Sequence, residues 1–523
     1  MKTLLPADGA VAAVDPVRPR IGFVSLGCPK NLVDSEVMMG LLDRAGGVMT
    51  QDAASADILV VNTCSFIDAA QQESVDTILE LAQHKTTGRA QKLIVAGCLV
   101  ERYRDEIQKN IPEVDAVVGT GELEKVLEAA GLSLPPEPQK TDSPFQILPA
   151  GVAARAEGEL REQQGRFARD EWQGATAELP SYLYDHTTPR LRATRSASAY
   201  IKIAEGCDHP CSFCVIPNLR GKFRSRRFES VVAEAEALVA DGVREITLIG
   251  QDTTCYGEDL GLKDGLALLL ERLAQIEGLV WLRFLYAYPN RITGKLLDTI
   301  ARHEKICKYL DVPLQHASGA VLKRMKRGAN AEILLKTLRQ ARERIPGLVV
   351  RTSFIVGFPG ETAEDFAELE AFVREAKIDW LGVFTYSDEE GSKAHALDGK
   401  LPRRTIEQRK RALMKLQKGI SHKAREQWVG RVVDVLVEGE SEETPLLWQG
   451  RSSLHAPEID GVVLINDFGP FEALTPGRFY RCEITEAHDY DVVARVIEAS
   501  EFEAAFEAEP ANASVATAVE ARS

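Results

Sequence analysis

Three cysteines within eight residues constrain this 523-residue chain more than any other feature of its sequence. They stand in the string Gly206-Cys207-Asp208-His209-Pro210-Cys211-Ser212-Phe213-Cys214. Cubane iron–sulfur clusters normally take four cysteines, so a three-cysteine site leaves one iron open to react with a bound molecule. The alternative is a zinc knuckle, but that would usually show a second Cys or His pair at zinc-finger spacing, and His209 lies too close to serve. The spacing therefore predicts a reactive 4Fe-4S cluster on Cys207, Cys211 and Cys214.

The composition limits the class of protein. The length allows about three domains of ~150 residues each. No apolar run reaches the ~18 residues that span a membrane, and the first twenty residues lack the pattern of a secretory signal. Nine cysteines, an odd number, are typical of a reducing cytosol rather than of a disulfide framework. The net charge of −15 argues against nonspecific nucleic-acid binding by the whole molecule. We therefore expect a cytoplasmic protein with no membrane partner.

Three further cysteines each follow a short apolar run near the N-terminus. The runs are residues 21–26, 58–61 and 93–96, and the cysteines after them are Cys28, Cys64 and Cys98. Helical patterns between the runs predict a doubly wound parallel α/β domain, which we place at 19–133. Ligands of such sheets bind beyond the carboxyl ends of the strands. We therefore expect these cysteines to converge on a second three-cysteine cluster, although each could instead be a small buried hydrophobe.

From residue 198 onward, six strand-like segments alternate with helical patterns. The segments are residues 199–204, 245–250, 281–287, 309–314, 349–357 and 380–386. They predict a partial (β/α)6 barrel over 198–425, which ends in a connecting helix rich in Lys and Arg at 403–425. Active sites of such barrels lie on the loops at the C-terminal face. The cysteine loop follows the first strand and is therefore expected on that face.

Several residues near the strand ends of this barrel are candidates for cofactor binding. Glycine lets a ligand approach the backbone closely and proline fixes a turn, so the Gly-Phe-Pro-Gly stretch after the fifth strand could form one wall of the site. Phe213 could shield the cluster, stack on its ligand or simply belong to the core. The predicted cofactor-binding residues are Phe213, Gln251, Asp252, Arg351, Ser353, Gly357 and Pro359.

A basic run follows the cysteine loop. It consists of Arg220, Lys222, Arg224, Arg226 and Arg227. A solvated surface run is slightly favoured over recognition of an anionic substrate, whose carboxylate or phosphate would suit the forked donors of arginine. The remaining cysteines have no partner pattern and are predicted to be ordinary thiols, namely Cys255, Cys307 and Cys482.

From residue 426 onward, the sequence pattern changes to short alternating strands. Five of them predict a small β-barrel of the oligonucleotide-binding kind over 426–498. These residues hold 15 Asp and Glu against five Arg and no Lys. Such a surface repels phosphates and attracts a basic protein. We therefore favour a protein over a nucleic acid as the partner of this barrel.

Three segments fit none of these domains. Residues 1–18 and the acidic tail at 499–523 are predicted to be disordered, because they hold few groups that could build a core. Residues 134–197 contain prolines and charges with weak periodicity and are interpreted as a linker with some helix. The end of this linker, Tyr182-Leu183-Tyr184-Asp185, is expected to pack on the barrel.

The cysteines at 207, 211 and 214 match the radical S-adenosylmethionine signature. With the three N-terminal cysteines and the terminal barrel, called a TRAM domain, the chain resembles the methylthiotransferase family over about residues 20–500. It is most similar to the RimO branch, on the segments Ser25-Leu26-Gly27-Cys28-Pro29-Lys30-Asn31, Ala204-Glu205-Gly206-Cys207 and Ile249-Gly250-Gln251-Asp252-Thr253-Thr254. The transfer-RNA branch, MiaB, typically reads Gly-Cys-Gln-Met-Asn in the first segment and has Asn where Asp252 stands. The long 134–197 linker departs from the compact family pattern.

The resemblance implies a transferase with two 4Fe-4S clusters that inserts a methylthio group at the β-carbon of an aspartate in a small-subunit ribosomal protein (number twelve). The cluster on Cys207, Cys211 and Cys214 would cleave S-adenosylmethionine to a 5′-deoxyadenosyl radical. The N-terminal cluster would hold a sulfur that a second S-adenosylmethionine methylates. The implied partners are the ribosomal protein or subunit, docked by the acidic barrel, with an electron donor and a sulfur source.

Three alternatives stay open at this point. A transfer-RNA (adenosine) methylthiotransferase of the MiaB type is disfavoured by the acidic barrel and by Asp252. A non-catalytic iron–sulfur RNA-binding or assembly factor would need neither an open iron nor S-adenosylmethionine. A radical methyltransferase without sulfur insertion would not need the three N-terminal cysteines.

Overall fold

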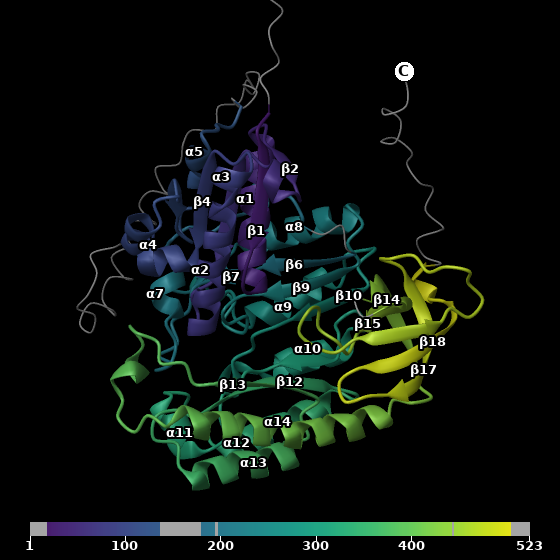
Figure 1. Ribbon diagram of the computed structural model, residues 1–523. Coiled ribbons are helices and arrows are strands. Elements are labelled where there is room, and N and C mark those ends of the chain that lie inside the picture. The colour runs from purple at the N-terminus through teal and green to yellow at the C-terminus, as the bar shows by residue number, and fades with distance from the viewer. Residues whose placement is uncertain (1–17, 136–178, 194–196, 442–443, 504–523) are drawn as a thin grey trace, which may run out of the picture.

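The computed structural model describes residues 18–135, 179–193, 197–441 and 444–503. Figure 1 shows three folded units in chain order: an N-terminal α/β unit, a central partial barrel and a C-terminal β-barrel. Most of the predicted disordered ends and residues 136–178 of the predicted linker lie outside the described residues. Within the described part of the chain, no helix combines the length and the apolar character needed to cross a membrane.

The N-terminal unit is a parallel sheet in the order β2-β1-β3-β4-β5. Its strands are β1 (Arg20–Ser25), β2 (Val48–Thr50), β3 (Ile58–Thr63), β4 (Lys92–Gly97) and β5 (Ala116–Val118). Its helices are α1 (Pro29–Arg44), α2 (Asp68–Ala82), α3 (His84–Thr87), α4 (Cys98–Asn110) and α5 (Val126–Ala130). Alternate side chains of β3 and β4 pack against α1 and α5 on one face and against α2 and α4 on the other. The predicted doubly wound domain is confirmed, and its strand order is of the flavodoxin-like kind.

The central unit contains all six predicted parallel strands. They form two sheets, β10-β9-β6 and β11-β12-β13, which an isolated bridge between Leu282 and Ile306 joins. The strands are β6 (Ser198–Lys202), β9 (Glu245–Ile249), β10 (Trp281–Phe284), β11 (Tyr309–Asp311), β12 (Val349–Val356) and β13 (Trp380–Thr385). A short antiparallel ribbon of β7 (Ala204–Glu205) and β8 (Arg224–Ser225) flanks the cysteine loop. The predicted partial (β/α)6 barrel is confirmed.

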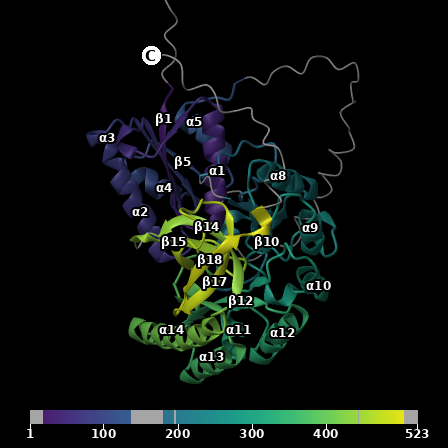
Figure 2. The ribbon, with the colours of Figure 1, turned by 90° about the vertical axis from the view of Figure 1, so that its right-hand side faces the viewer.

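Helices cover the outside of the partial barrel. They are α8 (Phe228–Ala240), α9 (Gly265–Leu273), α10 (Gly294–Arg302), α11 (Gly319–Arg324), α12 (Ala331–Arg344), α13 (Ala363–Ala376) and α14 (Arg403–Glu426), whereas the short α7 (Ile216–Arg220) lies at the seam with the N-terminal unit. Figure 2 shows α8, α9, α10, α12 and α13 following one another along the outer side of the strands. The apolar sides of these helices and the outward side chains of the strands build one continuous core.

The C-terminal unit is a closed barrel in the order β14-β15-β16-β18-β17. Its strands are β14 (Val432–Ser441), β15 (Thr444–Ser452), β16 (Val463–Asp467), β17 (Phe479–Ala487) and β18 (Val492–Ala499), which confirms the predicted five-stranded barrel. Residues 500–503, which the sequence assigned to a disordered tail, instead pack on the protein. Glu503 is 5% exposed and forms ion pairs with Arg244 and Arg478, so its buried carboxylate anchors residues 500–503 to the protein.

The end of the predicted linker binds two units together. Tyr184 is buried, and its hydroxyl donates to Glu234 on α8, so the linker end packs on the barrel as expected. Arg190 lies 2.6 Å from Glu36 on α1 and 2.6 Å from Glu234. This buried guanidinium therefore joins the N-terminal unit to the central one.

A buried ion-pair network closes the opening of the partial barrel at the start of its strands. Arg451 of β15 lies 2.7 Å from Glu245, the first residue of β9, and Arg283 of β10 lies 2.9 Å from the same carboxylate. All three side chains are at most 2% exposed. Burial opposes ionisation of Glu245, but the two arginines outweigh it and lower the pKa of the carboxyl to about 2. The C-terminal barrel therefore seals the end of the partial barrel that lies opposite the cysteine loop.

The variant Glu245→Gln should destabilise this junction. Removing one charge from a buried network leaves the others uncompensated and costs about 3 kcal/mol of unfolding free energy at neutral pH. The pKa of Glu245 in the folded protein lies below the unfolded value of 4.5. The decrease in unfolding free energy caused by the substitution should therefore be largest above pH 4.5 and should shrink as the pH falls toward 2. Denaturant unfolding of the metal-free protein at several pH values measures this free energy of unfolding.

Glu438→Gln, which removes a partly exposed partner of Arg451, is the matched control, and its expected cost in unfolding free energy is below about 1 kcal/mol. Equal losses in both variants at neutral pH would contradict the prediction.

Candidate active site

The three N-terminal cysteines lie at the carboxyl ends of neighbouring strands. Cys28 is the N-cap residue of α1 after β1, Cys64 directly follows β3, and Cys98 begins α4 after β4. Gly27 has a φ of +91°, and a Cβ there would lie 2.8 Å from the Cβ of Cys64. Only glycine lets the two chain segments come this close. The predicted convergence of the three strand ends is therefore found.

The environment of these thiols suits metal ligands. Burial raises the pKa of Cys98 to about 12. Burial also opposes ionisation of Cys28, but Lys30, Arg220 and backbone N–H groups at the start of α1 lower its pKa overall. A thiol must lose its proton to bind iron, and nearby cations offset the negative charge that results. Three converging sulfurs beside two cations fit an iron–sulfur cluster.

The second set of cysteines lies in the loop after β7, on the C-terminal face of the partial barrel. Gly206 has a φ of +79°, and a Cβ there would lie 2.1 Å from the carbonyl oxygen of Lys222, so the loop needs glycine at this position. Ser212 fixes the other end of the loop. Its N–H donates to the backbone carbonyl of Met325 at 3.1 Å, and its hydroxyl donates to the backbone carbonyl of Arg324 at 2.8 Å. The chain itself therefore holds the loop from both sides.

A stacked column lies beside this loop. The guanidinium of Arg327 lies 3.5 Å from the sulfur of Cys211 and 4.1 Å from the ring centre of Tyr288. Tyr288 in turn stacks on His209 with a ring separation of 3.8 Å. Arg327 places a positive charge next to a thiol that must become negative. The sequence analysis missed Arg327 and Tyr288, because no local motif links these loop residues to the cysteines.

The two sets of cysteines lie on the two sides of the seam between the N-terminal and central units. Cys98 packs in one buried apolar cluster with Val215 and Leu219. Val215 adjoins Cys214 in the chain, so Cys98 packs beside the residue that follows the second set. The hydroxyl of Thr120 also donates to the carbonyl of Leu219 at 2.7 Å. The N-terminal unit is therefore docked on the segment that follows the second cysteine loop.

The prediction that the basic run is a solvated surface is wrong for two of its members. Arg220 is 2% exposed and lies 2.6 Å from both Asp34 and Asn31 of the N-terminal unit, and it also contacts Glu205. Arg226 is equally buried and pairs with Glu234. Their carboxylate partners come from distant parts of the chain, which made these buried arginines look like surface residues in the sequence.

Gln251 and Asp252 lie close to the cysteine loop, as predicted. The side-chain amide of Gln251 donates to Glu205 at 2.6 Å. Asp252 lies 2.5 Å from His209 and 3.0 Å from Cys255. Burial opposes ionisation of Asp252, but hydrogen bonds from His209, Thr254 and Cys255 lower the pKa of the carboxyl overall. Cys255 therefore has a partner that the sequence did not reveal.

The other candidate cofactor residues are spread over the barrel. Arg351 lies 2.9 Å from Asp311 and 3.5 Å from Asp460 of the C-terminal unit, so it sits at the seam with the terminal barrel. Ser353, two residues further along β12, lies on the same face and is partly buried. Phe213 is partly buried and packs against the barrel core.

The turn after β12 has a structural role of its own. Gly357 has a φ of +79°, and a Cβ there would lie 2.5 Å from Ile406 of α14. Glu361 accepts hydrogen bonds from the N–H groups of Gly357 and Phe358 and pairs with Arg409 of α14. Pro359 is buried in the same turn. Packing against α14 thus explains much of this Gly-Pro pattern.

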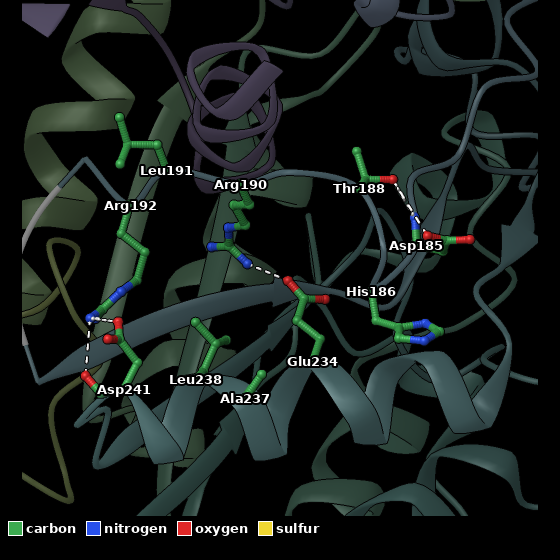
Figure 3. Close-up of a pocket in the computed structure, with 10 residues that line it drawn as sticks. All are labelled: Asp185, His186, Thr188, Arg190, Leu191, Arg192, Glu234, Ala237, Leu238 and Asp241. Atoms are coloured by element: carbon green, nitrogen blue, oxygen red, sulfur yellow. Dashed lines mark hydrogen bonds and ion pairs between the residues drawn. The ribbon is translucent and has the colours of Figure 1, made fainter. Parts of the chain in front are cut away.

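A cavity of about 420 Å³ lies elsewhere, between the linker end and α8. Figure 3 shows Arg190 pointing toward Glu234, with Arg192 against Asp241. None of the six cysteines lines this cavity. It is separate from the candidate site, which is defined by converging thiols rather than by an enclosed volume.

Comparison with known proteins gives the family. Residues 20–119 match the uncharacterized protein family UPF0004, residues 201–373 the radical SAM superfamily and residues 429–497 the TRAM domain. The chain is 68% identical to the ribosomal protein uS12 methylthiotransferase RimO of Koribacter versatilis, over 91% of this chain and 96% of the relative. Proteins of the same name from Solibacter usitatus and Trichlorobacter lovleyi are 57% and 45% identical, over 92% of this chain and 96% and 99% of the relatives.

The chain belongs to the RimO family. It is a radical S-adenosylmethionine transferase, and this membership indicates a 4Fe-4S cluster and S-adenosylmethionine as cofactors. The expected family and the three-unit architecture are confirmed.

Arg220→Gln should weaken the seam between the N-terminal and central units. The substitution leaves the buried carboxylates of Asp34 and Glu205 with one cation fewer, a loss of about 3–5 kcal/mol for a buried pair. Thermal unfolding of the metal-free protein should show a lower midpoint. Lys222→Gln, an exposed neighbour in the same basic run, should leave the midpoint unchanged. Similar unfolding midpoints for both variants would mean that Arg220 does not stabilise the seam between the two units.

Proposed function

We propose that this protein inserts a methylthio group at the β-carbon of an aspartate in ribosomal protein uS12, using two 4Fe-4S clusters and S-adenosylmethionine as radical source and methyl donor. The observation that carries the proposal is the packing of Cys98 in one cluster with Val215, the residue next to Cys214, at the seam between the two cysteine-bearing units. Methylthio insertion needs a radical source and a sulfur donor at one substrate carbon. Two three-cysteine sites on the two sides of one seam would provide both.

The chain's own residues would divide the work between these sites. Cys207, Cys211 and Cys214 would hold the cluster that binds S-adenosylmethionine, and Cys28, Cys64 and Cys98 would hold the cluster that carries sulfur. When bound, these groups supply a carbon-centred radical and a methylated sulfur, so the protein itself contributes placement and charge. Arg327 would offset the charge of the first site, and Lys30 and Arg220 would offset that of the second.

The S-adenosylmethionine pocket is proposed on the same face of the barrel. Asp252 and Gln251 have the best support, because each contacts a residue of the loop that carries the cysteines or directly precedes it. Phe213 could line the pocket from within the loop. The remaining candidates, Arg351, Ser353, Gly357 and Pro359, would act mainly by shaping the barrel, since Arg351 and Gly357 already have protein partners.

The partners follow from the proposed reaction. The acidic C-terminal barrel would dock the basic ribosomal protein, free or in the ribosomal subunit, and an electron donor and a sulfur source would serve the clusters. Glu440, Glu472 and Glu486 are exposed on this barrel, whereas Glu438 is held by the buried Arg451. The C-terminal barrel would hold the body of the substrate, and a loop of the substrate would extend from there to the cysteines at the other end of the strands.

The decisive experiment compares the whole enzyme with a variant in which Cys28, Cys64 and Cys98 are all replaced by Ala. Anaerobic reconstitution should give about eight irons per chain in the parent and about four in the variant, because each cubane cluster holds four irons. Both proteins should form 5′-deoxyadenosine under strong reductant, but only the parent should add a methylthio mass to an aspartate of uS12. A parent protein that leaves uS12 unmodified, or a variant that still modifies it, would refute the proposal.

Charge reversal should test the docking surface. The triple variant Glu440→Lys, Glu472→Lys and Glu486→Lys should bind uS12 at least about tenfold more weakly at low salt, and the difference should shrink at high salt as the charges are screened. The matched control reverses Glu343, Glu368 and Glu375, three exposed acids on α12 and α13. Affinity measured by fluorescence anisotropy should fall only in the first variant. A comparable fall in the control would assign the effect to net charge alone.

A further inference from the structure

Lys30 is a buried cation beside a cluster cysteine. It lies two residues after Cys28 in the first turn of α1 and is 8% exposed. Its ammonium lies 3.4 Å above the ring centre of Tyr286, and no carboxylate pairs with it among the residues that the structure describes. The neighbouring buried cations differ, since Lys202 pairs with Asp34 and Glu205, and Arg220 pairs with the same two carboxylates.

The position of Lys30 is unfavourable for the fold by itself. A positive charge in the first turn of a helix opposes the helix dipole. A buried ammonium without an anion also keeps part of its desolvation cost. The ring of Tyr286 offsets only some of this, because a cation–π contact contributes about 0.5–2 kcal/mol. The groups beside this cation are the ring of Tyr286 and the thiol of Cys28, and neither is a carboxylate, so the ammonium can still bind one.

The backbone of Tyr286 is a second indication of a functional site beside Lys30. It stands just beyond the end of β10 with a φ of +64°, a strained conformation for a bulky residue. Its N–H donates to Asp311 at 2.8 Å, which fixes the strained backbone. Such strain concentrates at functional sites. Lys30 of the N-terminal unit and Tyr286 of the barrel thus meet on the barrel face that carries the cysteine loop.

We propose that Lys30 binds the side-chain carboxylate of the target aspartate. This rests on the proposed function. The β-carbon of aspartate is bonded directly to the carboxylate carbon, so a carboxylate held beside Cys28 would place the reacting carbon next to the sulfur-carrying site. The ammonium is a compact charge on a flexible stem, which suits a carboxylate that must be positioned during the reaction.

The test measures substrate discrimination in the reconstituted holoenzyme. The probes are a peptide that spans the modified aspartate of uS12 and the same peptide with Asn at that position. The parent enzyme should bind the Asp peptide about 10- to 100-fold more tightly than the Asn peptide, the range expected for a hydrogen bond to a charged group. Lys30→Met should bind both peptides with similar affinity, and Lys30→Arg should recover part of the preference.

Two controls separate this role from others. Lys92→Met removes a lysine of the same domain whose ammonium donates to the backbone of Ala129, and it should keep the full preference for Asp. Iron content of Lys30→Met should match the parent, although the electron paramagnetic resonance signals of the cluster near Cys28 should shift because one nearby cation is lost. If Lys30→Met altered those signals while it kept the preference for Asp, Lys30 would serve the cluster and the inference would be wrong. A parent enzyme that neither binds nor modifies the Asp peptide would instead refute the proposed function.

Discussion

The relative position of the two cysteine sets depends on buried charges at the seam of the N-terminal and central units. Arg220 donates to Asp34, Asn31 and Glu205, and Lys202 pairs with the same two carboxylates. Ion pairs of this kind contribute little net stability, because desolvation offsets the Coulomb attraction, but they tolerate little displacement. A sliding apolar contact would leave the distance between the cysteine sets variable, whereas this network allows one arrangement.

The two ends of the partial barrel serve different purposes. At the start of the strands, Glu245 and Arg451 lock the C-terminal barrel over the opening. At the other end, the cysteine loop, Tyr286 and the N-terminal unit come together. Burying the first end in protein leaves the second as the face where small molecules and substrate meet, as in other parallel barrels. The TRAM unit thus completes the fold of the barrel as well as presenting an acidic surface.

The sequence predicted those features that are encoded locally. Strands such as β3 and β4 contain short apolar runs, and Cys28, Cys64 and Cys98 each follow such a run, so the architecture and the two cysteine sets could be derived from spacing. Arg220 and Arg226 were misjudged, because a basic run looks solvated until distant carboxylates such as Asp34 are brought beside it. Arg327 and Tyr288 could not be found at all, since they reach the cysteine loop only through the closure of the barrel. The partner of Cys255 was also missed, although Asp252 stands only three residues before it, because no sequence pattern marks a thiol that donates to a nearby carboxylate.

The charges of the chain therefore fall into two groups with different roles. Those that are paired within the protein, such as Arg220 with Asp34, fix one unit against another and cannot also select a substrate. Lys30 and the exposed acids of the terminal barrel are not used in this way among the described residues, so they remain available to a partner. A basic protein that presents one acidic side chain would match both, with its body attracted by the barrel and its carboxylate by the lysine. A polyanionic nucleic acid would be repelled by the acidic barrel and would offer no carboxylate to the lysine.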